Sequence, residues 1–256
     1  MGLFARAHLP RWLHRAFLRW YIRRYGVDMS ESVGDIDDFG TFTEFFTRSL
    51  RSGLRPVDPR PDALVAPCDG RVYACGTVED GMLPQSEGRH FRALELLGGD
   101  SRFDAGEYAV LYLSPRDYHR VHTPREGLVR GFRYVPGHLW PVFPGAAAQI
   151  EGLFAHNERL VTWLHTDLGE VAVVMVGAFG VGRIRVVYDP IISNQGHPPT
   201  EGVLPEPMAV ARCGELGRFE MGSTVILLLP PGSVTWTVRP GDAIRLGAAI
   251  ATLRSN

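Results

Sequence analysis

The segment Thr224-Val225-Ile226-Leu227-Leu228-Leu229 lies between a Gly-Ser pair and a Pro-Pro-Gly turn. Short apolar and β-branched runs that are bounded by Gly or Pro are typical of β-strands. Eight further segments of this kind lie between Arg55 and the C-terminus, namely residues 64–65, 71–73, 108–113, 128–134, 159–164, 171–176, 183–188 and 235–238. With 29 glycines and 19 prolines in the chain, the sequence predicts a mainly β (α+β) fold, a barrel or sandwich of short strands.

Two pieces of this β body resemble each other. Residues 64–72 read Leu-Val-Ala-Pro-Cys-Asp-Gly-Arg-Val, and residues 239–247 read Arg-Pro-Gly-Asp-Ala-Ile-Arg-Leu-Gly. Both are similar to the hammerhead pieces of a biotinyl/lipoyl-type barrel-sandwich, so we expect a barrel-sandwich-like body. Residues 79–106 have the weakest strand pattern, and we expect a long loop there with a short helix near residues 92–97.

The N-terminal region differs from the rest in charge, because its six arginines precede the first acidic residue, Asp28. Within residues 9–25, two stripes recur at helical spacing. The first stripe is apolar and aromatic and the second is basic: Trp12, Leu13, Ala16, Phe17, Trp20 and Tyr21, and then Arg11, Arg15, Arg19 and Arg23. A basic, aromatic amphipathic helix of this kind can lie in the interface of an anionic membrane, and we expect it to do so here. The alternative is a helix that packs on the body and keeps its arginines in water.

A second short helix is predicted over residues 41–50, where Phe42, Phe45 and Phe46 recur. We therefore divide the chain into a basic, amphipathic, membrane-associating helical region at residues 1–50 and a β-rich domain at residues 51–256.

Composition excludes several classes of protein. The 256 residues are 45% hydrophobic and 10% aromatic, with 27 basic and 28 acidic residues, which fits one soluble domain. All 27 basic residues are arginine, so the chain has no lysine for pyridoxal phosphate, for a P-loop or for a lipoyl or biotinyl group. No apolar run reaches the length of a membrane span and no secretory signal is present, so we expect a cytoplasmic protein with reduced cysteines.

Three local clusters contain residues with chemical potential. They are Pro67-Cys68-Asp69-Gly70, the run from Asp117 to His122, and Glu220-Met221-Gly222-Ser223-Thr224-Val225. Together they supply a carboxylate, two histidines and a serine, which are the groups needed to activate a hydroxyl nucleophile. The His-x-x-His pair has no third ligand, so no metal site is expected. A Gly-x-Ser-x-Gly elbow is absent, which disfavours an α/β-hydrolase but leaves a hydrolase of another fold open.

The same clusters resemble motifs of the prokaryotic-type phosphatidylserine decarboxylases. The family's Phe-Phe-x-Arg is similar to residues 45–48, its Pro-x-Asp-Gly to residues 67–70, and its Leu-x-Pro-x-Asp-Tyr-His-Arg-x-His-x-Pro block to residues 113–124. Further counterparts are residues 135–139, 157–159, 176–182 and 222–224, the last of which resembles the family's Gly-Ser-Thr self-cleavage motif. Met221 stands where the family usually has Leu, and Cys68 where Ala is common.

The resemblance implies a proenzyme that cuts itself between Gly222 and Ser223 into residues 1–222 (β chain) and 223–256 (α chain). Ser223 would then become a covalent pyruvoyl group, the cofactor in place of pyridoxal phosphate or a metal, and residues 51–256 would be the catalytic domain. Asp69 and His122 are implied as the orienting acid and the base of self-cleavage. His119 is implied as the proton donor to the substrate, and Tyr112 as a residue that lines the site.

The resemblance also implies partners and a location. The substrate would be phosphatidylserine, decarboxylated to phosphatidylethanolamine at the cytoplasmic side of the cell membrane, where the protein would bind peripherally to the anionic surface. The two chains would form a heterodimer, alone or as a dimer of heterodimers, and no nucleic acid is expected. Two alternatives stay open: a soluble pyruvoyl decarboxylase that acts on a free amino acid, and a non-catalytic membrane-associated barrel. An anionic lipid with another backbone, such as an ether lipid, would fit the same sequence.

Overall fold

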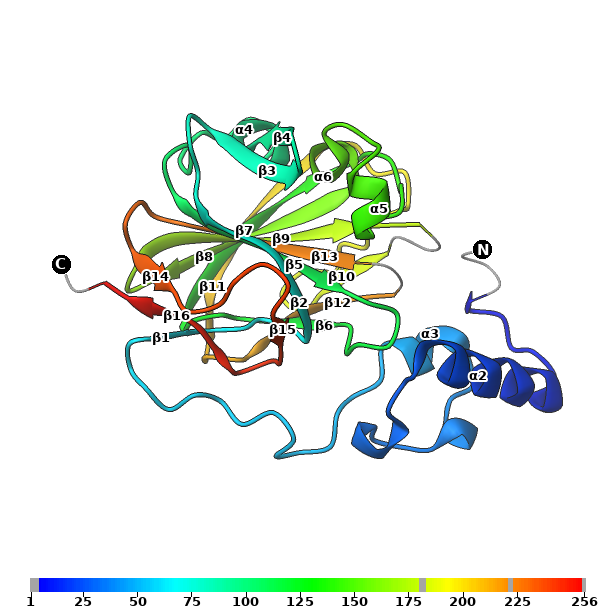
Figure 1. Ribbon diagram of the computed structural model, residues 1–256. Helices are drawn as coiled ribbons and strands as arrows, with labels where there is room; N and C mark the ends of the chain where they lie inside the picture. The colour runs from blue at the N-terminus through cyan, green and yellow to red at the C-terminus, as the bar shows by residue number, and fades with distance from the viewer. Residues whose placement is uncertain (1–4, 180–182, 221–222, 255–256) are drawn as a thin grey trace.

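The computed structural model describes residues 5–179, 183–220 and 223–254. A β-rich body makes up most of the molecule, and a small helical region lies at one side of it (Figure 1). An extended segment without regular structure connects this helical region to the first strand of the body. The prediction of a mainly β fold with N-terminal helices is confirmed.

The centre of the body is an antiparallel eight-stranded sheet in which β13 is an inner strand. Residues 223–229 of β13 pair with β5 on one side and with β9 on the other. The order of the sheet is β11 (Thr200–Val210), β7 (Gly127–Val135), β8 (Arg159–Thr166), β9 (Gly169–Gly177), β13 (Ser223–Leu229), β5 (Glu107–Leu113), β2 (Gly70–Thr77) and β15 (Ala243–Ile244).

The described residues also form three smaller sheets. They are β1 (Ala63–Val65), β16 (Ala249–Leu253) and β14 (Val234–Trp236); β10 (Ile184–Val186), β12 (Glu215–Phe219) and β6 (Arg120–His122); and the hairpin β3 (Met82–Ser86) with β4 (Arg89–Arg92). Short helices α4 (Ala93–Leu96), α5 (Pro144–Ala147) and α6 (Leu153–His156) lie on the same side of the large sheet as this hairpin (Figure 1).

Strand β13 is apolar because both of its faces are buried. Val225, Leu227 and Leu229 point into one hydrophobic cluster, which includes residues of β1, β12 and β16. Ile226 and Leu228 point into a second cluster on the other face, under the β3–β4 hairpin. A strand that is covered on both faces reads as a continuous apolar run, and each large side chain that it buries contributes about 1.5–3 kcal/mol of transfer free energy.

The described part of the helical region contains α2 (Arg11–Tyr25), α3 (Phe42–Phe46) and the 3-10 turns η1 (Met29–Glu31) and η2 (Ile36–Asp38). Helix α2 ends at Gly26, whose φ of 70° places it in the left-handed region that glycine tolerates. Its buried face packs against the aromatic residues of α3 in a separate apolar cluster. None of the helices in the described ranges is long and apolar enough to cross a bilayer.

The structure confirms all nine predicted strands and the long N-terminal helix, which begins at Arg11. Three expectations need correction. The second helix ends at Phe46 rather than residue 50, and beyond it the side chain of Arg48 donates to the carbonyl of Arg116 in the body. Residues 79–106 contain the β3–β4 hairpin instead of a long loop, although the short helix expected there is present as α4. Strands β6, β11, β12, β15 and β16 were not predicted.

The two similar pieces of sequence lie side by side. Strand β15 pairs with the start of β2, so that Ala243 is opposite Arg71 and Ile244 is opposite Gly70. Beyond this pairing, the backbone amide of Ala66 donates a hydrogen bond to the carbonyl of Ala248 at 2.8 Å. The two pieces therefore pack against each other although they are far apart in the sequence.

Gly70 is required by close backbone approach. Its φ is +152°, and a Cβ at this position would lie 2.4 Å from the carbonyl oxygen of Tyr112. We expect Gly70→Ala to lower the free energy of unfolding by about 2–4 kcal/mol. The matched control is Gly88→Ala, which also has a positive φ but has open space around it, and which we expect to lose only about 1 kcal/mol. Urea denaturation measures both, and equal losses would contradict the packing argument.

Candidate active site

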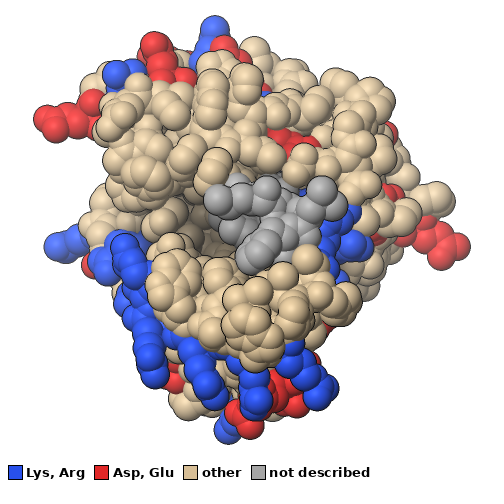
Figure 2. Space-filling model, turned by 90° about the vertical axis from the view of Figure 1, so that its right-hand side faces the viewer, with Lys and Arg blue, Asp and Glu red and all other residues tan. Residues whose placement is uncertain are grey.

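A pocket of about 560 Å³ opens between the helical region and the body. Figure 2 shows it as the hollow on this face of the molecule. Its walls are largely aromatic and apolar: Tyr21, Tyr25, Phe46, Tyr112, Leu113, Pro115, His119, Pro141, Val142, Phe143, Ala178, Phe179 and Ser223. An apolar pocket with a few converging polar groups is the usual form of a small-molecule site.

Ser223 begins the inner strand β13 at this pocket. It is paired with Leu113 of β5 and with Gly177 of β9, so its backbone position is fixed from both sides. The side chain is 1% exposed, and its Oγ has no hydrogen-bond partner among the described residues. A buried hydroxyl without a partner is rare in proteins and marks a position with a chemical or strained role.

His119 lines the same pocket and is held in one orientation. Its ring packs on Phe46 with 3.9 Å between centroids, and its Nδ1 lies 2.8 Å from the carbonyl oxygen of Asp117. Because a carbonyl oxygen only accepts hydrogen bonds, Nδ1 carries the proton and Nε2 keeps its lone pair. Nε2 has no partner among the described residues. Burial lowers the pKa of His119 to about 3, so the ring is neutral near pH 7.

The turn that carries His119 is itself fixed by hydrogen bonds. Asp117 accepts from the amide and the hydroxyl of Ser114, each at 2.7 Å. From the helical region, Tyr21 donates to the carbonyl of Pro115 at 3.1 Å, and Arg48 donates to the carbonyl of Arg116 at 3.0 Å. The N-terminal region therefore supports the position of His119 directly.

Tyr112 also lines the pocket and lies opposite Thr224 on the neighbouring strand. Burial raises the pKa of its hydroxyl, so the phenol is protonated near pH 7. The structure thus brings together three of the predicted residues, Ser223, His119 and Tyr112. Gly222, on the other side of the predicted cut, lies outside the described residues.

Asp69 and His122 do not line this pocket. The carboxylate of Asp69 accepts from Arg55 at 2.6 Å and from the amide of Leu246 at 2.8 Å. Nδ1 of His122 lies 2.8 Å from the carbonyl of Cys213, and its Nε2 lies 3.1 Å from the hydroxyl of Tyr118. Burial lowers the pKa of His122. The negative charge of the nearby Asp69 raises this pKa, but its effect is smaller than that of burial.

Arg55 was not predicted to be important and is the main partner of Asp69. It also donates to Glu31 at 2.6 Å, and Glu31 in turn accepts from Arg245 at 3.3 Å. The hydrogen bond to Asp69 raises the pKa of Arg55. This network joins the helical region, the start of the body and the C-terminal piece around one buried carboxylate. No motif spacing connects these residues, since they come together only through the fold.

A second unpredicted cluster lies just before the predicted cut. Glu220 is buried and forms ion pairs with Arg185 at 2.6 Å and with Arg183 at 3.5 Å. The amide of Glu220 also donates to the carbonyl of Arg183 at 2.8 Å. These contacts fix the backbone three residues upstream of Ser223, and the pairing of β13 fixes it from Ser223 onward.

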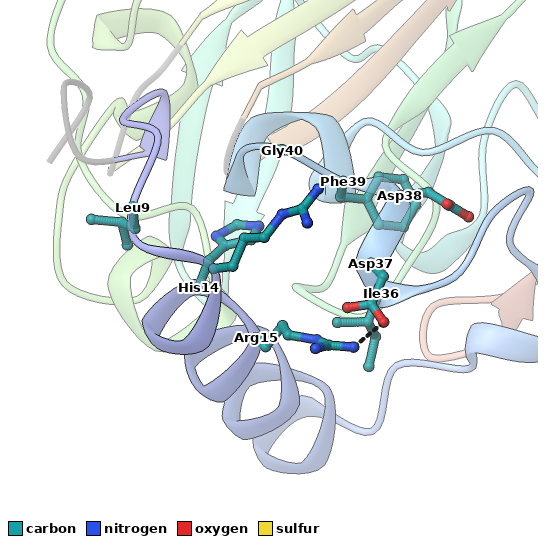
Figure 3. A pocket seen from close by; sticks show the side chains of 9 residues that line it. Leu9, His14, Arg15, Ile36, Asp37, Asp38, Phe39 and Gly40 are labelled. Carbon is teal, nitrogen blue, oxygen red and sulfur yellow. Dashed lines mark hydrogen bonds and ion pairs between the residues drawn. The ribbon is translucent and has the colours of Figure 1, made fainter.

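A separate cavity of about 380 Å³ lies between α2 and η2 and contains none of the predicted site residues. Figure 3 shows its wall, with the ion pair between Arg15 and Asp37 and the buried ring of His14. Within residues 5–179, 183–220 and 223–254, no group of three or more His, Cys, Asp or Glu residues has the arrangement of a metal site.

The burial of His119 predicts a pH dependence of stability. Between pH 6.5, where an exposed histidine titrates, and the folded pKa of about 3, the unfolded chain binds more protons at this residue than the folded chain does. The stability that neutral His119 contributes is therefore present above pH 6.5 and is lost as the pH falls.

In the Ser223→Ala chain, which lacks the predicted nucleophile, we expect His119 to account for a loss of about 1.5 kcal/mol in the free energy of unfolding between pH 6.5 and pH 5. When His119→Phe is added to the Ser223→Ala chain, the free energy of unfolding should fall by about 1.5 kcal/mol less between pH 6.5 and pH 5. Urea denaturation at both pH values measures the difference. Equal losses in the two chains would show that His119 titrates normally.

Comparison with known proteins agrees with the motif analysis. A family profile described as "Phosphatidylserine decarboxylase" matches residues 42–252. The chain is 48% identical over 255 residues to a phosphatidylserine decarboxylase proenzyme of Anaeromyxobacter sp. (strain K), covering 96% of this chain and 90% of the relative. It is 42% identical to the corresponding proenzyme of Myxococcus xanthus and 40% identical to that of Shewanella amazonensis, each time over 99% of this chain and 92% of the relative.

Proposed function

The chain belongs to the phosphatidylserine decarboxylase family, and we propose that it is a proenzyme that cuts itself before Ser223 and then decarboxylates phosphatidylserine. One observation carries the residue assignment. Ser223, with a buried hydroxyl that has no partner among the described residues, begins an inner strand at a pocket that it shares with His119. The proposed activity is that of a carboxy-lyase.

Self-cleavage requires only groups of the chain and one water molecule. The hydroxyl of Ser223 loses its proton to a base and attacks the carbonyl carbon of Gly222, which converts the peptide bond into an ester and frees the amine of residue 223. Loss of the α-proton of residue 223 then expels the carboxylate of Gly222 and leaves dehydroalanine. Its imine tautomer takes up water and releases ammonia, which leaves a pyruvoyl group at position 223.

Asp69 and His122 are our proposed acid and base for this cut. Supporting features are the neutral state of His122, the carbonyl of Cys213 that orients its Nδ1 proton, and the nearby charge of Asp69. For His122 to take the serine proton, its Nε2 has to exchange the Tyr118 hydroxyl for Ser223. Glu220 and its two arginines would hold the upstream side of the cut in place while this occurs.

The residues around position 223 fit a pyruvoyl group. The position is buried, no described residue hydrogen-bonds the side-chain oxygen, and the chain has no lysine that would supply an alternative. When formed, a pyruvoyl carbonyl there supplies an electrophile for the substrate amine and a sink for the electrons that decarboxylation releases.

The pocket residues would then bind the substrate and move one proton. Nε2 of His119 keeps its lone pair, so it would accept a proton from the substrate ammonium and return it to the carbon that loses carbon dioxide. A substrate anion beside the ring would raise the low pKa of His119 and assist this exchange. The apolar walls, Tyr112 among them, exclude water from the carboxylate and thereby favour the release of neutral carbon dioxide.

The two chains would stay together after the cut. Strand β13 would begin the small chain, and it keeps its pairing with β5 and β9 and its burial on both faces. Strands β14 and β16 pair within the small chain, while β16 and β15 also pair with β1 and β2 of the large chain. The mature protein is therefore proposed as a tight heterodimer.

We also propose that α2 brings the protein to the anionic surface of the membrane that holds its substrate, as a peripheral protein on the cytoplasmic side. Helix α2 exposes Trp12 and Trp20 together with all of its arginines. Aromatic and basic side chains on one exposed helix favour the headgroup region of an anionic bilayer.

The intact mass of the purified protein, before and after borohydride reduction, tests the cut. We expect two chains, residues 1–222 and a chain that begins with a pyruvoyl group at position 223. Only the small chain should gain mass on reduction, because it alone carries a ketone. Ser223→Ala should give a single, uncut and borohydride-insensitive chain. A wild-type protein that remains one chain would contradict the proposed maturation.

The two histidines are separated by comparing His122→Ala with His119→Ala, using as a control His90→Ala, which removes an exposed histidine of β4 outside the pocket. We expect His122→Ala to remain uncut, because the proposed base of self-cleavage is removed. His119→Ala should cut but decarboxylate phosphatidylserine in mixed micelles about 10²–10⁴ times more slowly. Gel electrophoresis and carbon dioxide release measure the two steps. If instead His119→Ala stays uncut and His122→Ala is cut but slow, the two histidines have the opposite roles. If the wild-type protein releases carbon dioxide from free serine but not from the lipid, it is a soluble amino-acid decarboxylase.

A further inference from the structure

Two phenylalanines stand at the mouth of the pocket on the side of the body. Phe143 is 50% exposed and Phe179 is 60% exposed, although both also line the pocket. They come from different segments, since Phe143 lies just before α5 and Phe179 follows β9. Two large apolar side chains that meet at one opening are a patch rather than isolated surface residues.

The opposite side of the mouth belongs to α2. Tyr21 and Tyr25 of α2 line the pocket, while Trp12 and Trp20 of the same helix are exposed. Among the described residues, the exposed large aromatic side chains are these two tryptophans and the two phenylalanines of the body. Figure 2 shows the hollow on this face with a row of arginines along the edge beside it. Both sides of the mouth therefore present aromatic groups, and one of them adds positive charge.

We propose that Phe143 and Phe179 form a second membrane contact, on the catalytic body itself, that seats the mouth of the pocket against an anionic bilayer. This inference rests on the proposed function, because a bilayer is the surface that holds the substrate. Charge complementarity identifies the occupant: the arginines of α2 attract anionic headgroups, and aromatic rings are favoured at the depth of the headgroups.

This arrangement defines how the substrate reaches Ser223. A pocket of about 560 Å³ has the size of a drug-like ligand rather than of a whole diacyl lipid. With the mouth pressed onto the bilayer, the headgroup enters between the phenylalanines and the tyrosines of α2 while the acyl chains remain in the membrane. The lipid then never has to cross water to reach the site.

Flotation of the full-length protein with vesicles of phosphatidylglycerol, without phosphatidylserine, tests the contact apart from catalysis. We expect the double variant Phe143→Ser/Phe179→Ser to need about ten times more lipid for half-maximal binding, since two apolar contacts are lost. The matched control is Val187→Ser/Val203→Ser, which removes two exposed apolar side chains of the body outside this pocket and should bind like the wild type. Wild-type binding by the phenylalanine variant would overturn the proposal, as would an equal loss in the control.

A second pair of substitutions excludes misfolding as the cause. Phe143→Trp/Phe179→Trp keeps the aromatic groups, and tryptophan partitions well at the membrane interface, so we expect binding at least as tight as that of the wild type. If the tryptophan variant and the serine variant both bind more weakly than the wild type, the two phenylalanines are needed for folding and not for membrane contact. Because the vesicles contain no substrate, a failure of this proposal leaves the decarboxylase assignment untouched. Loss of decarboxylation with intact flotation would affect only that assignment.

Discussion

The burial of β13 on both faces is the constraint on which the rest of the structure depends. Val225 and Leu227 anchor one apolar cluster, Ile226 and Leu228 anchor the other, and β5 and β9 supply hydrogen bonds on both edges. A residue at the start of such a strand has little freedom to move. Ser223 is that residue, so the hydroxyl proposed to cut the chain is positioned by the hydrophobic core itself. The same burial would keep the two products of the cut together, because the small chain would begin with this inner strand.

The burial that fixes the site also sets its electrostatics. His119 is neutral because desolvation by Phe46 and its other neighbours disfavours the imidazolium ion, and its tautomer follows from the carbonyl of Asp117. The carboxylates of Asp69 and Glu220 do not line the pocket. Asp69 is neutralised by Arg55 and Glu220 by Arg183 and Arg185, so these carboxylates are paired before any substrate arrives. A substrate with a carboxylate and a phosphate would therefore be the main source of negative charge within the pocket, which supports His119 as the group that responds to it.

Local pattern was sufficient to predict the central strands, because runs such as 171–176 and 224–229 are apolar enough to be read alone. Strand β11 was missed because Pro205 and Pro207 interrupt its pattern, and it tolerates them as an edge strand with a register shift between Val203 and Met208. Ser223, His119 and Tyr112 were placed at one site by resemblance to a family, and the fold brings them to one pocket. The ion pairs of Arg55 and Glu220 were not predicted, since their partners are distant in sequence and no spacing encodes such a contact.

The N-terminal helix has one buried face and one exposed face, so its packing on the protein leaves room for the proposed membrane contact. Leu18 and Tyr21 are buried against α3, as a packed helix requires, while Trp12 and Trp20 remain exposed beside the arginines. Tyr21 connects the two roles, because it lines the pocket and its hydroxyl donates to the turn that carries His119. A helix that served only as a tether would not need this contact. Since α2 forms one wall of the pocket, the attachment of the helix to a bilayer would fix the direction in which the pocket opens, and the position of the protein on the membrane and the geometry of its site would be set by the same element.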